Sequence, residues 1–160
     1  MQTKKEPTQY DLCGQDVLDI AKDLIRQFHS HLANKSIKFL FINKPITRNG
    51  RSVAATAEKI GDKIKVISED TDFLITISAP VWVDLSEELR RYVLDHELCH
   101  CWVEEKDDGE EKNKILPHDF EDFTELIRRY GVLTPELQKL REILKNINNK
   151  EKNDASDEED

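Results

Sequence analysis

The spacing of apolar residues predicts an amphipathic helix near the start of the chain and short strands after it. Apolar residues recur every three or four positions from residue 17 to residue 28, which places them on one face of a helix. They are Val17, Ile20, Ala21, Leu24, Ile25 and Phe28. Residues 37–42 (IKFLFI) form a short apolar run that indicates a strand, and Lys44-Pro45 ends it.

Turn signals divide the next stretch into further strands. Asn49-Gly50 is a strong turn signal, and we expect residues 53–60 after it to form a strand. Gly61-Asp62 ends that strand, and residues 63–67 indicate another because apolar residues alternate with lysines there. Residues 73–77 form the last predicted strand, and an extension as far as residue 83 stays open.

A helix is predicted to begin after Ser86. This serine suits an N-cap, and Glu87 and Glu88 in the first turn are favoured by the helix dipole. We expect the helix to end at about residue 102 or 103. Residues 107–114 follow as a charged loop.

Two more helices are predicted near the end of the chain. The first begins at Pro117 and stops at Gly131, a residue common at helix ends. Its apolar residues are Phe120, Phe123, Leu126 and Ile127. The second begins at Thr134-Pro135, with Leu137, Leu140, Ile143 and Leu144 on one face.

Length and composition indicate one polar globular domain. A chain of 160 residues can bury one core, and we expect a single domain over residues 11–147 between disordered ends, residues 1–10 and an acidic tail over residues 148–160. No apolar run approaches the roughly 20 residues that cross a bilayer. The N-terminus lacks the apolar segment of a secretory signal, so we expect the protein in the cytoplasm.

Charge and cysteine content narrow the range of partners. The net charge is −9, and residues 150–160 carry two lysines against six acidic residues, so nucleic acid is not an expected partner. The oligomeric state stays open. Cys13, Cys99 and Cys101 show no disulfide spacing, which favours reduced thiols. We expect Cys99 and Cys101 to share a helix as small buried hydrophobic residues. His29 and His31, at the end of the first helix, are expected to be structural or solvent-exposed.

The strongest chemical signal is the sequence His96-Glu97-Leu98-Cys99-His100, an HExxH motif within a predicted helix. Histidines four residues apart lie about 40° apart around the helix axis, so both imidazoles can bind one Zn²⁺. Glu97 lies at the edge of that face, where its carboxylate can accept a proton from a water that zinc makes acidic. By chance, such a motif would appear in a chain of this size at a rate of roughly one in a hundred or less.

A catalytic zinc ion usually has three protein ligands, so a third must come from elsewhere in the chain. We favour His118 at the start of the helix after Pro117. The alternatives on that helix are Glu121, Asp122 and Glu125. Asp95 and Asp119 are candidates to orient ligating histidines through hydrogen bonds, although Asp119 equally suits a helix start.

Several motifs together resemble the family of phage metallopeptidases, small proteins related to the SprT-like and wider zincin group. The resemblance covers residues 15–133 and is tightest over residues 80–131. The matching segments are Trp82 with Leu85-Ser86, then LDHELCHC over residues 94–101, PHDFEDF over residues 117–123, and RRYG over residues 128–131. The HExxH motif occurs in unrelated families, whereas its combination with the HDFxxF segment and RYG is much more specific.

The resemblance implies a zincin-like α+β fold, with a small antiparallel or mixed sheet packed against the N-terminal helix and the HExxH helix, and with C-terminal helices. It also implies a zinc peptidase site on His96, His100 and Glu97, with His118 matching the third ligand. The origin would be a phage or prophage. The match does not identify a group that stabilises the transition state, for which Tyr130 and Tyr92 are the candidates. The C-terminal helix and the acidic tail lie outside the resemblance.

These observations predict a zinc-dependent metallopeptidase that hydrolyses a host or phage protein or peptide. Residues 73–84 would border the cleft and bind substrate by strand addition, although Trp82 in that stretch is the better candidate for core packing. The first alternative is a zincin-fold binding or anti-defence module that engages a host protein without catalysis, which would tolerate loss of Glu97. The second is a structural zinc site closed by four protein ligands.

Overall fold

The computed structural model describes residues 5–157, with side chains described up to residue 151. The chain divides into two compact units, residues 1–116 and 117–160, and each is described separately. The single domain expected over residues 11–147 stays a prediction. The disorder expected at residues 1–4 and 158–160 lies outside the described residues.

The first unit contains a mixed four-stranded sheet with the order β1-β2-β6-β5. These strands are β1 (Tyr10–Leu12), β2 (Ile37–Ile42), β5 (Ala55–Lys59) and β6 (Phe73–Ser78). The central pair, β2 and β6, is parallel, and the two outer pairs are antiparallel. With the helices described below, this arrangement confirms a mixed α+β fold.

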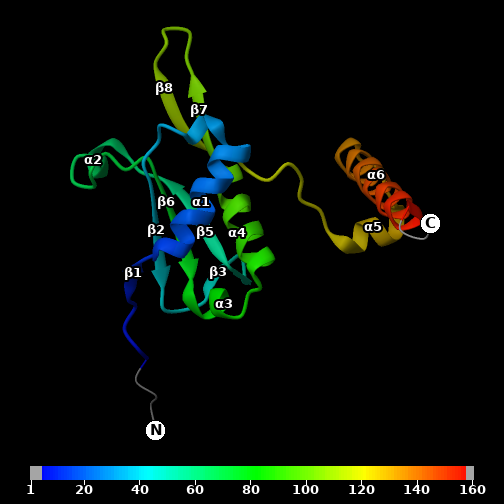
Figure 1. Cartoon of the computed structure of the whole chain (residues 1–160), viewed down its shortest axis with the longest axis horizontal. Helices are drawn as coiled ribbons and strands as arrows, with labels where there is room; N and C mark the ends of the chain where they lie inside the picture. The colour runs from blue at the N-terminus through cyan, green and yellow to red at the C-terminus, as the bar shows by residue number, and fades with distance from the viewer. Residues whose placement is uncertain (1–4, 158–160) are drawn as a thin grey trace. The chain divides into compact units, whose positions relative to one another are not determined.

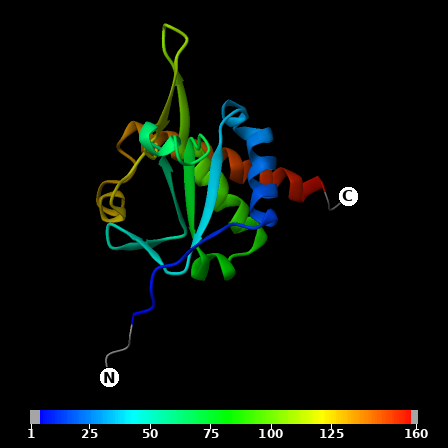
Figure 2. The same cartoon turned by 90° about the vertical axis from the view of Figure 1, so that its left-hand side faces the viewer.

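Two helices, α1 (Gln15–Phe28) and α4 (Glu87–His100), lie side by side next to the sheet (Figures 1 and 2). Alternate residues of a strand point to the same face of the sheet. On β6 these residues are Phe73, Ile75 and Ile77, and all three are fully buried in the core. They share one hydrophobic cluster with Leu94 and Leu98, one turn apart on α4, and with residues of α1. Burial of one face of α4 leaves its remaining faces for chemistry.

The strand β6 cannot add a substrate strand, because β2 and β5 already pair with its two edges. The prediction that residues 73–84 bind substrate in this way is therefore wrong. The strand also stops at Ser78, and the short helix α3 (Ala79–Val83) follows, with proline in its first turn. Trp82 is buried 6.1 Å from the ring of Phe41, and the Arg90 guanidinium lies 5.4 Å from its ring, which confirms core packing.

The turn predicted at Asn49-Gly50 is confirmed. It joins β3 (Ile46–Arg48) to β4 (Arg51–Val53), and both turn residues have the positive φ that a type I′ turn requires, +50° and +73°. The strand expected over residues 53–60 is in fact divided, because Val53 ends β4 and β5 begins at Ala55.

The strand predicted over residues 63–67 is wrong, since this stretch starts with the short helix α2 (Asp62–Lys65). The amides of Ile64 and Lys65 both donate to the carbonyl of Gly61. Sheet pairing of β5 with β6 runs through Lys59 and Phe73, so residues 60–72 only connect the two strands. Ile64 and Val66 are accordingly exposed rather than packed on a sheet face.

The HExxH helix ends earlier than predicted, at His100 rather than at residue 102 or 103. Cys101 adopts extended backbone and begins β7 (Cys101–Glu105), which pairs with β8 (Glu111–Ile115). Half of the charged loop expected over residues 107–114, namely residues 111–114, is therefore strand. Its charges form cross-strand pairs such as Lys114 with Glu104, which explains how so polar a segment can form a hairpin.

The second unit contains α5 (Thr124–Tyr130) and α6 (Pro135–Asp157). The helix predicted to begin at Pro117 begins seven residues later, and residues 117–123 are irregular. Gly131 ends α5 with φ +70°, as predicted. α6 extends through residues 148–157, which we expected to be part of a disordered tail. Among the described residues, no helix is both long and apolar enough to cross a membrane.

Candidate metal centre

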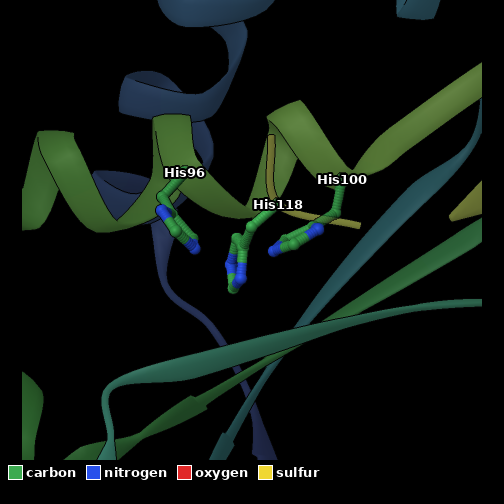
Figure 3. A group of neighbouring side chains, drawn as sticks. All are labelled: His96, His100 and His118. Carbon is green, nitrogen blue, oxygen red and sulfur yellow. The ribbon is translucent and has the colours of Figure 1, made fainter. Parts of the chain in front are cut away.

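The helix α4 presents His96 and His100 on one face. Its start is fixed by Ser86, whose Oγ accepts a hydrogen bond from the amide of Leu89 at 3.2 Å, as the sequence predicted. The two imidazoles are half-buried, and their ring centroids lie 5.1 Å apart (Figure 3). The four-residue spacing thus places both rings where they can share an ion.

The ring of His100 is oriented by the backbone of Leu116. Its Nδ1 lies 2.6 Å from the carbonyl oxygen of Leu116, while the amide of Leu116 donates to the carbonyl of His100 at 2.8 Å. A carbonyl only accepts, so in this bond Nδ1 carries the proton and Nε2 keeps its lone pair for a metal. The sequence could not indicate this partner, because the backbone of a leucine has no sequence signature.

His118 follows Leu116 by two residues. Two residues of extended chain span about 7 Å. One ligand atom from each of His96, His100 and His118 lies within 4.8 Å of the others, and Figure 3 shows the three rings converging. The prediction that His118 starts a helix is wrong, since it lies in the irregular segment 117–123. Its Nδ1 is 3.5 Å from Glu121 Oε1.

The choice of third ligand stays a prediction. In the part of the chain that the structure describes, the convergent group consists of three histidines and includes no carboxylate from Glu121, Asp122 or Glu125. Three imidazole nitrogens suit Zn²⁺, and ligands at tetrahedral positions on zinc lie about 3.4 Å apart. Because the separations are at most 4.8 Å, small side-chain rotations bring these donors to such spacings. The donor set therefore fits a metal ion.

Glu97 is buried, with 6% of its surface exposed. It follows His96 directly, about 60° from His100 around the helix axis. Burial of Cys101, together with the charges of Glu97 and Cys99, raises the pKa of the Cys101 thiol to about 12. A thiol in this state is inert, and Glu97 is a buried carboxylate next to the first histidine of the pair.

The neighbouring residues differ in part from the sequence expectations. Asp95 bonds to His29, with Oδ1 2.6 Å from Nε2. Cys99 is exposed, so its expected burial is wrong, and Cys101 is buried but lies on β7 rather than α4. The structural interpretation of His29 is confirmed, because the residue is 5% exposed and its ring is bonded to Asp95. His31 bonds to the carbonyl of Cys101 at 3.0 Å.

An α+β protein with an HExxH helix and convergent imidazoles has a group of side chains that could hold a metal ion. The family comparison makes this more specific. The family model described as putative phage metallopeptidase matches residues 12–149, and the chain belongs to that family. Membership in this family implies that the protein uses a metal ion and that it is a hydrolase acting on peptides. No curated protein matches the chain.

Proposed function

We propose that this protein is a zinc-dependent peptidase with a zincin-like catalytic fold. The observation that supports the proposal most directly is the convergence of His96, His100 and His118 beside the buried Glu97. Metal ligands on one helix, with the glutamate next to the first of them, are the arrangement that HExxH hydrolases use. Family membership also favours peptide hydrolysis.

His96, His100 and His118 would hold the ion through neutral imidazole nitrogens. When bound, zinc supplies Lewis acidity that makes water reactive near neutral pH. The carboxylate of Glu97 accepts the proton from the attacking water and then donates it to the leaving amine. The Leu116 carbonyl orients His100 and increases the basicity of its other nitrogen.

A peptide substrate is expected to bind in an extended conformation. In the described sheet β5 is an edge strand that follows β6 in the strand order, and it packs next to α4. An edge strand offers unpaired backbone groups that can hydrogen-bond an extended peptide. This assigns to β5 the role that the sequence had suggested for residues 73–84.

Metal content tests the site first. Tag-free protein purified without added metal should carry zinc, and His96→Ala should lose the ion from this site. Glu88→Gln, an exposed change in the first turn of α4, serves as the matched control and should retain it. Protein that neither carries zinc nor takes it up when zinc is supplied would overturn the proposal.

Glu97→Gln tests the catalytic role. The variant should retain zinc but lose peptidase activity by about 10²-fold to 10⁴-fold, because the amide cannot accept the proton. The readout is the appearance of new peptide termini, by mass spectrometry, in a mixture of proteome-derived peptides. If the protein has a measurable biological effect and Glu97→Gln retains it fully, a non-catalytic binding module is the better explanation.

A further inference from the structure

The helix α4 carries a second pair of potential metal ligands four residues apart. Asp95 and Cys99 lie about 40° apart around the axis, as His96 and His100 do. The two pairs are separated by about 100°, so they lie on different faces of the same helix. Cys99 is solvent-exposed, and the side chain of Asp95 is 37% exposed. Solvent therefore reaches this second face.

A third donor comes from α1, next to α4 in the fold (Figure 1). His29 is the C-cap residue of α1, and its amide donates to the carbonyl of Ile25 at 3.1 Å, which fixes the backbone. Its Nε2 lies 2.6 Å from Asp95 Oδ1. Ligand atoms of His29, Asp95 and Cys99 all lie within 4.8 Å of one another.

We propose that His29, Asp95 and Cys99 bind a second divalent cation, with Zn²⁺ as the favoured ion. Imidazole, carboxylate and thiolate are the three protein donors that zinc uses, and the soft thiolate disfavours Mg²⁺ and Ca²⁺. Two ligand atoms on one zinc ion lie roughly 3.4 Å apart. Binding therefore requires the hydrogen bond between Asp95 and His29 to break and the carboxylate of Asp95 to move away from the ring of His29 to about this distance. The exposed side of Cys99 leaves the fourth position to water.

The second ion would join α1 to α4. The same seam carries the ion pair of Asp23 on α1 with Arg91, one turn before Asp95, at 2.8 Å. Cation binding at the C-terminal end of α1 would strengthen this seam and hold the helix that presents the HExxH motif. The site does not depend on the proposed catalysis, because it shares no ligand with the group of three histidines.

Titration of metal-free full-length protein with Co²⁺, under a non-thiol reductant, tests this site. A thiolate bound to Co²⁺ gives a strong near-ultraviolet charge-transfer band that imidazole ligands do not give. We expect two equivalents of Co²⁺, with the band, and displacement by Zn²⁺. Cys99→Ser should lose the band and one equivalent, and since Cys99 is exposed the fold should be retained. Asp95→Asn should weaken binding of the ion that gives the band.

Two controls separate this site from the catalytic proposal. Cys13→Ala alters a thiol elsewhere in the structure and should keep the band. His96→Ala should keep the band while losing the other equivalent. Absence of the band in the unmodified protein, its persistence in Cys99→Ser, or its loss in His96→Ala would overturn the second site. A band with no binding at the three histidines would instead support this site and contradict the proposed function.

Discussion

At the scale of single residues, Asp72 shows how one carboxylate connects several parts of the first unit. It is 9% exposed and accepts hydrogen bonds from Lys65 Nζ at 2.6 Å, from the amide of Ser36 at 2.9 Å and from Asn113 Nδ2 at 2.8 Å. Burial acts to raise the pKa of Asp72, but these three donors outweigh it and hold the pKa below its ordinary value. The ionised carboxylate therefore stabilises the fold.

We expect Asp72→Asn to lower the free energy of unfolding by about 1–3 kcal/mol, measured by urea denaturation at pH 7. A lowered folded-state pKa means that this stabilisation is present above the ordinary pKa of about 3.9 and is lost as the pH falls through the folded value. The variant should thus lose part of the acid dependence below about pH 4. Asp62→Asn, an exposed change on α2, is the control, and equal effects of both would contradict this role.

Single residues also show where sequence reasoning succeeds. The positions of His96, Glu97 and His100 follow from helix periodicity, which depends only on local spacing. His118 lies close to the two histidines of the motif because hydrogen bonds join His100 to the backbone of Leu116. Helix periodicity cannot predict these bonds. The partner of Asp95 could not be foreseen either, because His29 lies 66 residues away and only tertiary packing brings it to α4.

At the scale of elements, the N-cap of α4 is expected to contribute to the stability of the fold. Ser86→Ala removes the acceptor of the Leu89 amide, and we expect a loss of about 1 kcal/mol in the free energy of unfolding. Metal binding should persist, because the HExxH residues lie three turns further along the helix. Ser52→Ala, at an exposed serine of β4, should have a smaller effect on the urea midpoint. A Ser86 effect no larger than this control would show that the cap contributes little.

The elements predicted correctly are those with strong local signals, such as α1, β2 and the Asn49-Gly50 turn. The errors fall where tertiary pairing overrides a weak pattern. Residues 63–67 alternate like a strand, yet the sheet offers them no neighbour. The segment containing β8 looks like a charged loop, and it becomes a strand because β7 pairs with it and the opposite charges match across the hairpin.

At the scale of the whole molecule, the main core and the C-terminal helix can be separated experimentally. The buried cluster and the apolar residues packed against it all lie between Cys13 and Val103, within the first unit. On α6, Leu137 is buried but is not part of this cluster, and Ile143, Leu144 and Ile147 are each about half exposed, at 47%, 50% and 47%. The core therefore contains the packing that a stable fold requires without residues of α6.

We accordingly expect a chain that ends at residue 132, without α6, to keep the stability of the core. Trp82 and Trp102 both lie in the first unit, so their fluorescence reports its unfolding. The change in the free energy of unfolding should stay below about 0.5 kcal/mol, the range of surface changes. Zinc content should match the full chain, because His118 is retained. A clearly lower urea midpoint, or loss of zinc from the shortened chain, would mean that α6 supports the core or the metal centre, and the two units would then have to be treated as one cooperative structure.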